Sequence, residues 1–107
     1  MKIAYFCSFF LLLSFTALSA QSTLRGSVHD ADNGQALIGA NIQLTSVNRG
    51  TITDSLGNFR FDNLKPGRYP VSITYLGYQQ LRLQEVLVSS GKEQVLDLSL
   101  QEAATSL

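Results

Sequence analysis

The only histidine of this 107-residue chain is the first candidate for catalysis. His29 precedes Asp30 and lies close to Asp32, so a carboxylate could orient its imidazole as a general base. Such a base needs a nucleophile, and no serine lies in a nucleophile elbow. The alternation of apolar residues places His29 on the solvent side of a strand. We therefore predict a surface or turn role for this residue.

Metal and cofactor sites are also disfavoured. Asp54 and Gly57 could suggest a calcium loop, but calcium takes about six to eight oxygen ligands and the required Asp/Asn spacing is missing. We expect instead that Asp54 accepts backbone N–H bonds within a turn and that Gly57 takes a positive φ. One cysteine and one histidine are too few for a zinc cage, and no glycine-rich phosphate loop is present. The prediction is a non-enzymatic chain that needs no metal and no cofactor.

Three tyrosines could offer a platform for stacking sugars. Tyr69 and Tyr75 share the phase of the inward-facing residues, which favours a place in the core. Tyr78 follows Gly77, where the strand breaks. Two interpretations of Tyr78 remain open: its hydroxyl bonds back to the backbone at a strand corner, or its ring is exposed for a partner.

The charges are balanced, with eight Lys and Arg against eight Asp and Glu. A nucleic-acid binder would cluster its basic residues to meet phosphates, so this class is disfavoured. Five of the basic residues are scattered over several strands without forming a run, which predicts a solvated surface. These five are Arg25, Arg60, Lys65, Arg68 and Arg82.

Residues 1–20 read as a secretory signal peptide, because a basic start is followed by an apolar centre and a small-residue exit. Cleavage after Ser19 and cleavage after Ala20 are both open, with Ala17 as the better −3 partner for Ser19, and a retained membrane anchor is the alternative. Cys7 lies too early, and too deep in the apolar run, for a lipidated cysteine. An exported chain without further cysteines fits a bacterial periplasm better than a disulfide-rich secretion.

The elements that must position these residues are strands, since period-two alternation recurs from residue 24 onward and helical periodicity is absent. Lys65-Pro66-Gly67 predicts a type II turn with Gly67 in the left-handed position. A change of phase near Gln84-Glu85 predicts a bulge. The predicted core is Val28, Ile38, Ala40, Ile42, Leu44, Phe59, Phe61, Val71, Ile73, Tyr75, Val88, Leu96 and Leu98.

About seven strands with frequent turns predict an all-β, seven-stranded antiparallel sandwich over residues 21–100. Two sheets can then bury the apolar faces of their strands against each other. Residues 101–107 show no period and are predicted to be a tail or linker.

Four sequence words follow one another at the spacing of a known family. They are LRGSVHDADNGQALIGANIQL (24–44), GTITDSLGNFRF (50–61), LKPGRYPVSITYLGYQ (64–79) and VLDLSL (95–100). Over residues 23–100 the chain resembles the carboxypeptidase-regulatory-like family, whose domains adopt a transthyretin-like (prealbumin-like) sandwich. This resemblance implies the same sandwich here.

The resemblance also implies a function. Domains of this family often form the N-terminal extension of TonB-dependent outer-membrane transporters, so it implies an exported periplasmic domain associated with the outer membrane. The implied partner is a transporter plug or a TonB-type energising protein. The alternatives are a stand-alone carbohydrate-binding module, with a glycan as ligand, and a structural spacer of a surface protein. The chain itself is expected to be a fragment, a truncated product or a stand-alone relative of such a transporter.

Overall fold

The computed structural model describes residues 21–104, and within this range every regular element is a β-strand. The predicted all-β fold is therefore confirmed. The predicted signal peptide and the last three residues of the predicted tail lie outside the described residues. The seven strands are β1 (Ser22–Asp30), β2 (Asn41–Leu44), β3 (Arg49–Ile52), β4 (Asn58–Leu64), β5 (Gly67–Thr74), β6 (Leu81–Val88) and β7 (Glu93–Leu100).

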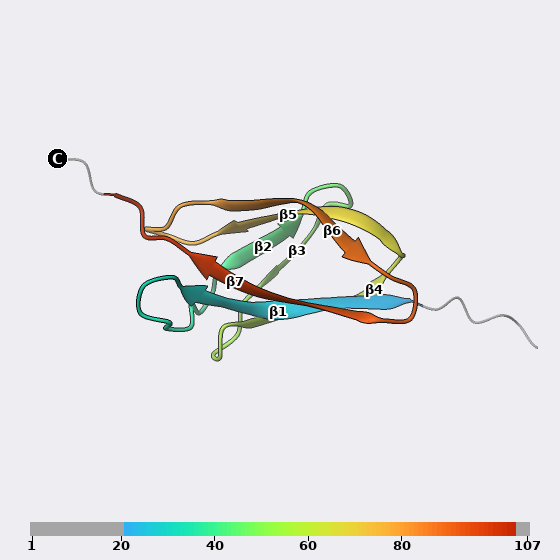
Figure 1. Cartoon of the computed structure of the whole chain (residues 1–107), viewed down its shortest axis with the longest axis horizontal. Coiled ribbons are helices and arrows are strands. Elements are labelled where there is room, and N and C mark those ends of the chain that lie inside the picture. Colours follow the sequence, from blue (N-terminus) through green and yellow to red (C-terminus); the bar gives the residue numbers. More distant parts are fainter. Residues whose placement is uncertain (1–20, 105–107) are drawn as a thin grey trace, which may run out of the picture.

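The strands form two sheets that pack face to face, with orders β4-β1-β7 and β3-β2-β5-β6 (Figure 1). The sandwich is confirmed, but one detail of the prediction is wrong. Among the strand pairs of residues 21–104, four are antiparallel, while β1 and β7 run parallel. The reason is that β7 follows a crossing from one sheet to the other after β6, and its direction is not set by a hairpin with β1.

The core lies between the sheets because each strand presents every second residue to the opposite layer. The buried apolar residues are Leu24, Val28, Leu37, Ala40, Ile42, Leu44, Phe59, Phe61, Leu64, Tyr69, Val71, Ile73, Val86, Val88, Leu98 and Leu100. Tyr75 and Leu96, both predicted in the core, are only partly buried and pack against it. Among residues 21–104, every buried apolar residue lies between Leu24 and Leu100.

The prediction that Ile38 belongs to the core is wrong, because this residue is 56% exposed and its neighbour Leu37 is buried. The N–H of Leu37 donates to the carbonyl of Val28 at 3.0 Å, which turns Leu37 inward before β2 begins. Gly39 has φ +82°, so the chain bends and the alternation restarts at Ala40. Side chains alternate between the two faces only along a continuous strand, and residues 37–40 do not form a continuous strand.

The predicted bulge near Gln84-Glu85 is confirmed. Along β5 and β6, Tyr69 pairs with Val86 and Val71 with Leu83, so two residues of β6 oppose the single residue Pro70. Proline has no N–H to donate to the ladder, which suits it to the irregular position. The bulge explains why inward residues of β6 change from odd to even numbers.

Candidate interaction surface

Asp54 organises the turn between β3 and β4. Its Oδ1 accepts hydrogen bonds from the backbone N–H of Leu56 and of Asn58, both at 2.9 Å. Gly57 has φ +79°, and an added Cβ there would meet Ala36 at 2.9 Å. The carboxylate and the glycine thus act together on backbone geometry.

The connection around Pro66 differs from a type II turn with a left-handed glycine. Gly67 does not have a positive φ and already belongs to β5, where it pairs with Val88. The left-handed residue is Asn63, with φ +59°, near the end of β4. The hydroxyl of Tyr69 donates to the carbonyl of Lys65 and so ties the connection to the core. The left-handed backbone conformation is therefore taken by Asn63, before the Pro-Gly pair, and not by Gly67.

Tyr78 lies after a tight turn in which its N–H donates to the carbonyl of Tyr75 at 3.0 Å and Gly77 has φ +85°. Its hydroxyl donates to Asp30 Oδ2 at 2.5 Å. The bond to the carboxylate, together with burial, raises the pKa of Tyr78 to about 12. The hydroxyl therefore bonds within the chain, to a carboxylate of β1 and not to the backbone.

Asp30 is the centre of this contact and is buried, with 3% of its surface exposed. Besides the hydroxyl of Tyr78, it accepts the N–H groups of Asp32 at 2.7 Å and Asn33 at 3.1 Å. The hydrogen bond from Tyr78 and these backbone bonds lower the pKa of Asp30 below its ordinary value. Asp30 is thus an anion held by donors at one end of the sandwich, and its atoms are engaged in structure.

The first residues of the predicted tail are ordered. Gln79 N–H donates to the carbonyl of Gln101 at 2.8 Å, and Ala103 N–H donates to the carbonyl of Gly77 at 2.9 Å. Tyr78 and Glu102 form an antiparallel bridge between these bonds. The chain therefore leaves the sandwich along the turn that carries Tyr78.

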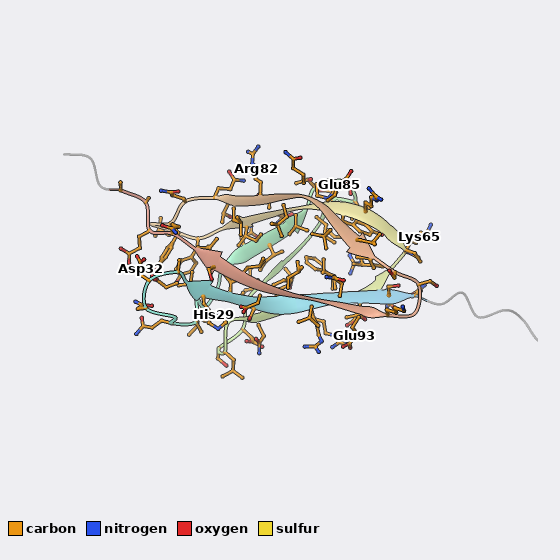
Figure 2. All side chains as sticks on the ribbon, viewed as in Figure 1. His29, Asp32, Lys65, Arg82, Glu85 and Glu93 are labelled. Atoms are coloured by element: carbon orange, nitrogen blue, oxygen red, sulfur yellow. The ribbon has the colours of Figure 1, made fainter. Side chains whose placement is uncertain are left out.

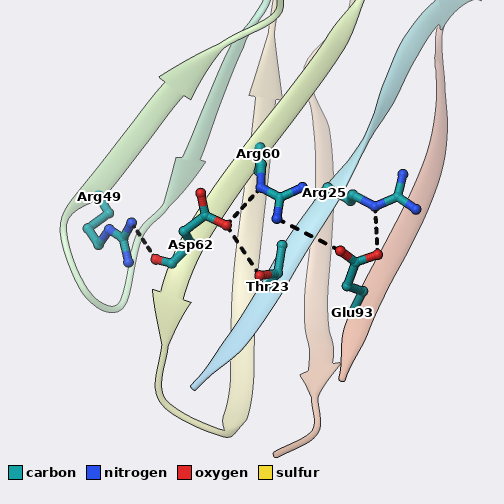
Figure 3. A network of polar contacts seen from close by, with 6 residues as sticks. All are labelled: Thr23, Arg25, Arg49, Arg60, Asp62 and Glu93. Carbon is teal, nitrogen blue, oxygen red and sulfur yellow. Dashed lines mark hydrogen bonds and ion pairs between the residues drawn. The ribbon is translucent and has the colours of Figure 1, made fainter. Parts of the chain in front are cut away.

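Arginines that are dispersed in the sequence meet on the outer face of the sheet β4-β1-β7 (Figure 3). Arg25 Nε lies 3.0 Å from Glu93 Oε2, and Arg60 bridges Asp62 at 2.7 Å and Glu93 at 3.8 Å. Arg49 is not on this face, because it belongs to β3 of the other sheet, and it reaches β4 by donating to the carbonyl of Asp62 at 3.0 Å. The paired side chains are 44–53% exposed, so each bridge contributes about 0–1 kcal/mol. The face is a neutralised polar surface.

Several other charged residues lie apart from this network. Arg82 and Glu85 lie on β6, in the other layer, and Lys65 lies in the β4–β5 connection (Figure 2). His29 Nδ1 faces Asp97 at 3.6 Å, and its side chain is 33% exposed. In the part of the chain that the structure describes, no group of three or more His, Cys, Asp or Glu residues is placed to hold a metal ion. Residues 21–104 include no helix long and apolar enough to cross a membrane.

The edges β6 and β7 leave part of the core accessible. Leu81 and Leu83 of β6 face inward opposite Ile73 and Val71, and Leu96 of β7 faces inward opposite Gly26, yet all three leucines are only partly buried. Both strands have a neighbour on one side only. We call these two strand edges, with Leu81, Leu83 and Leu96, the β6–β7 seam.

Thr53 is a structural residue that the sequence pattern did not single out. It is buried, its Oγ1 accepts the N–H of Ala40 at 2.8 Å and donates to the carbonyl of Leu37 at 2.5 Å. It therefore supports the irregular segment before β2. The available signal was its place directly before Asp54 in the word TDSLGNF (53–59).

Two packed sheets with open edges define a β-sandwich domain. Residues 23–101 match the model of the carboxypeptidase regulatory-like domain, and the chain belongs to that family. It is 38% identical over 73 residues, or 68% of its length, to the TonB-dependent receptor SusC of Bacteroides thetaiotaomicron. It is 31% identical over 84 residues, or 78% of its length, to human carboxypeptidase D. The chain spans only 7% and 6% of these two relatives.

Solved structures agree on the fold. A chain of a cohesin–X-dockerin complex from Acetivibrio cellulolyticus superposes with a TM-score of 0.64 at 21% identity, covering 76% of this chain and 58% of that one. A Bacteroides uniformis protein provisionally described as carbohydrate-binding superposes with a TM-score of 0.60 at 14% identity, over 75% of this chain and 41% of that one. At these identities the likeness concerns the sandwich alone.

Proposed function

We propose that this chain is a non-enzymatic interaction domain, exported to the periplasm, which belongs to or derives from the N-terminal extension of a TonB-dependent outer-membrane transporter. The observation that carries the proposal is the 38% identity to the receptor SusC over most of the domain. The residues considered for catalysis or binding make contacts within the domain, which supports a structural role for them: His29 faces Asp97, and the Tyr78 hydroxyl bonds Asp30. The domain would act by docking.

The β6–β7 seam supports docking by strand addition, and β7 is the better of its two edges. β6 carries a bulge opposite Pro70, which interrupts its ladder, whereas β7 pairs with β1 through eight consecutive residues without a break. A strand laid beside β7 would gain backbone hydrogen bonds and would cover Leu96. The β7 edge is therefore the proposed contact.

The side chains of β7 also indicate which kind of segment would bind there. Inward positions of an added strand would face Leu96, and outward positions would lie near Val95, which is 52% exposed. The side chain of Asp97 is 86% exposed and would attract a basic residue. The occupant is thus an extended protein segment that alternates apolar and basic residues, from a transporter plug or a TonB-type energising protein.

A photo-crosslinking amino acid at Val95, in cells that export the chain, tests this contact. The matched control is Val47, a valine 45% exposed in the β2–β3 turn of the other sheet. We expect crosslinks to an outer-membrane transporter or an energising protein from position 95 and none from position 47. Equal crosslinking from both positions, or none from position 95, contradicts the proposed edge.

Sequencing the DNA downstream of this reading frame tests whether the chain belongs to a transporter. We expect sequence that encodes a plug and a β-barrel, either in the same frame or after a frameshift. A stop codon with no such code nearby would leave only a stand-alone domain.

One feature favours a carbohydrate-binding module as the second candidate. On the outer face of the sheet that contains β5 and β6, a hollow of about 450 Å³ is lined by hydrogen-bonding side chains that include Ser72, Gln80 and Arg82. Gln80 Nε2 donates to Ser72 Oγ at 2.6 Å, so these groups already form a polar row suited to sugar hydroxyls. Calorimetry against a panel of neutral glycans tests it, with Gln80→Ala as the site variant and Tyr78→Ala as the comparison. No heat with any glycan excludes this candidate. If neither the crosslinking nor the calorimetry finds a partner, a structural spacer is the remaining function.

A further inference from the structure

The first and last strands of the sandwich are neighbours and run in the same direction. β1 and β7 are aligned through eight consecutive pairs, from Thr23 opposite Glu93 to Asp30 opposite Leu100. The chain therefore enters this ladder at one end and leaves it at the other, and the two ends of the described chain lie at opposite ends of the domain (Figure 1). A pull between them acts along both strands in opposite directions.

The direction of this load decides how the ladder resists it. The bonds of a parallel pair are evenly spaced between the strands, so sliding one strand past the other strains all of them together. A load that enters and leaves at the same end would instead open the bonds one after another. Opening in sequence requires much less force than breaking the whole ladder at once, because only one bond is loaded at a time.

Further contacts hold β1 and β7 in register. The ladder continues beyond the strands at both ends, and one ion pair crosses it on the outer face. These contacts are Thr23 N–H to Lys92 carbonyl at 3.3 Å, Ala31 N–H to Leu100 carbonyl at 2.9 Å, and Arg25 to Glu93 at 3.0 Å. On its other side β1 is held by β4. Sliding β7 therefore cannot simply carry β1 along.

We infer that the β1–β7 ladder is a mechanical clamp, by which this domain holds tension between a partner that grips the sandwich and the chain that continues past residue 104. The clamp does not need a covalent attachment at residue 21, because β1 lies in the middle of its sheet and stays with the body of the domain. This function is separate from docking on β7: a strand added beside β7 would pull on β7 itself, so the ladder is loaded only when the domain is held through β1 or the opposite sheet.

Single-molecule pulling with two pairs of handles tests the clamp. The chain from residue 21 onward contains all buried apolar residues of the described range and no cysteine, so engineered cysteines are unique attachment points. The first protein carries Gln21→Cys and Ala104→Cys, which load the ladder along its length. The second carries Gln21→Cys and Lys92→Cys, which lie at the same end of the ladder, since Thr23 bonds Lys92. All three sites are exposed.

The extended chain measures about 270–300 Å between residues 21 and 104 and about 230–260 Å between residues 21 and 92. The length released on unfolding is this value minus the folded separation of the two handles, which spans the ladder in the first protein and is short in the second, so both proteins should show one step of similar length when the whole domain unfolds. Matching urea midpoints for the two proteins show that the substitutions leave the fold equally stable. Any difference in rupture force then comes from the direction of the load.

We expect the end-to-end geometry to unfold at several times the force of the same-end geometry at equal pulling speed. Equal forces, or a weaker end-to-end geometry, would overturn the clamp. Neither result bears on crosslinking at Val95, so the clamp and the docking proposal can fail separately.

Discussion

Gly26 is the position where one methyl group should be most damaging. It lies in the middle of β1, between Phe59 of β4 and Leu96 of β7. A Cβ built on Gly26 would lie 2.0 Å from the carbonyl oxygen of Leu96 and 3.0 Å from the ring of Phe59. The first of these atoms is backbone in an eight-pair ladder, so it cannot move aside alone. We therefore expect Gly26→Ala to distort the sheet β4-β1-β7.

The magnitude follows from overpacking. Extra volume in a well-packed core costs about 1–3 kcal/mol, and a clash with backbone belongs at the upper end. Replacing glycine within a strand recovers about 0.5–1 kcal/mol of chain entropy. The net loss is about 2 kcal/mol, which lowers the urea midpoint by about 1 M for the slopes typical of small domains.

Gly67→Ala is the matched control. Gly67 also lies in a strand and has no positive φ, but the nearest atom to its added Cβ is Tyr69 Cε2 at 4.0 Å. We expect this variant to be unchanged or stabilised by up to about 1 kcal/mol. Urea unfolding followed by circular dichroism measures both. A Gly26→Ala midpoint equal to that of Gly67→Ala would refute the close approach of β1 and β7.

Three further outcomes are expected. Phe61→Ala removes a ring that is 2% exposed and should cost about 3–5 kcal/mol, enough to unfold a small domain, as loss of the strand signal in circular dichroism would show. Thr53→Val leaves the buried N–H of Ala40 without its hydroxyl acceptor and should cost about 1–3 kcal/mol in urea, whereas Thr53→Ser should retain most of that stability. The pKa of Tyr78 is raised to about 12 from an ordinary value of 10, so its stabilising contribution is complete below pH 10 and is lost as the pH rises toward 12. Tyr78→Phe should therefore lose less stability over that interval, and an identical alkaline loss in both proteins would contradict the bond to Asp30.

Much of the fold follows from local pattern. Alternation in residues 59–61 and 71–73 predicted strands with the correct inner faces, and the change of phase near residue 84 located the bulge. These features depend only on which face of a continuous strand is apolar. The failure at Ile38 has the same origin, since Gly39 at φ +82° interrupts the strand and the count of two no longer applies.

The candidate surface was less accessible from sequence. The pattern marked Tyr78 as notable and placed it after a glycine turn, but it could not name Asp30, which is 48 residues away and bonds its hydroxyl. The arginines looked dispersed because Arg25 and Arg60 belong to strands that are distant along the chain and adjacent in the sheet. The β6–β7 seam depends on which strands end each sheet.

The sequence alone determined where the strands lie, which of their faces are buried, and that Asp54 and Gly57 stand in a turn, because these properties depend on near neighbours. The tertiary structure alone decided that β1 and β7 lie side by side and parallel, and that Asp30 meets Tyr78. Backbone hydrogen bonds are chemically the same between any two strands, so the choice of partner and direction is made only when both sheets close over the shared core.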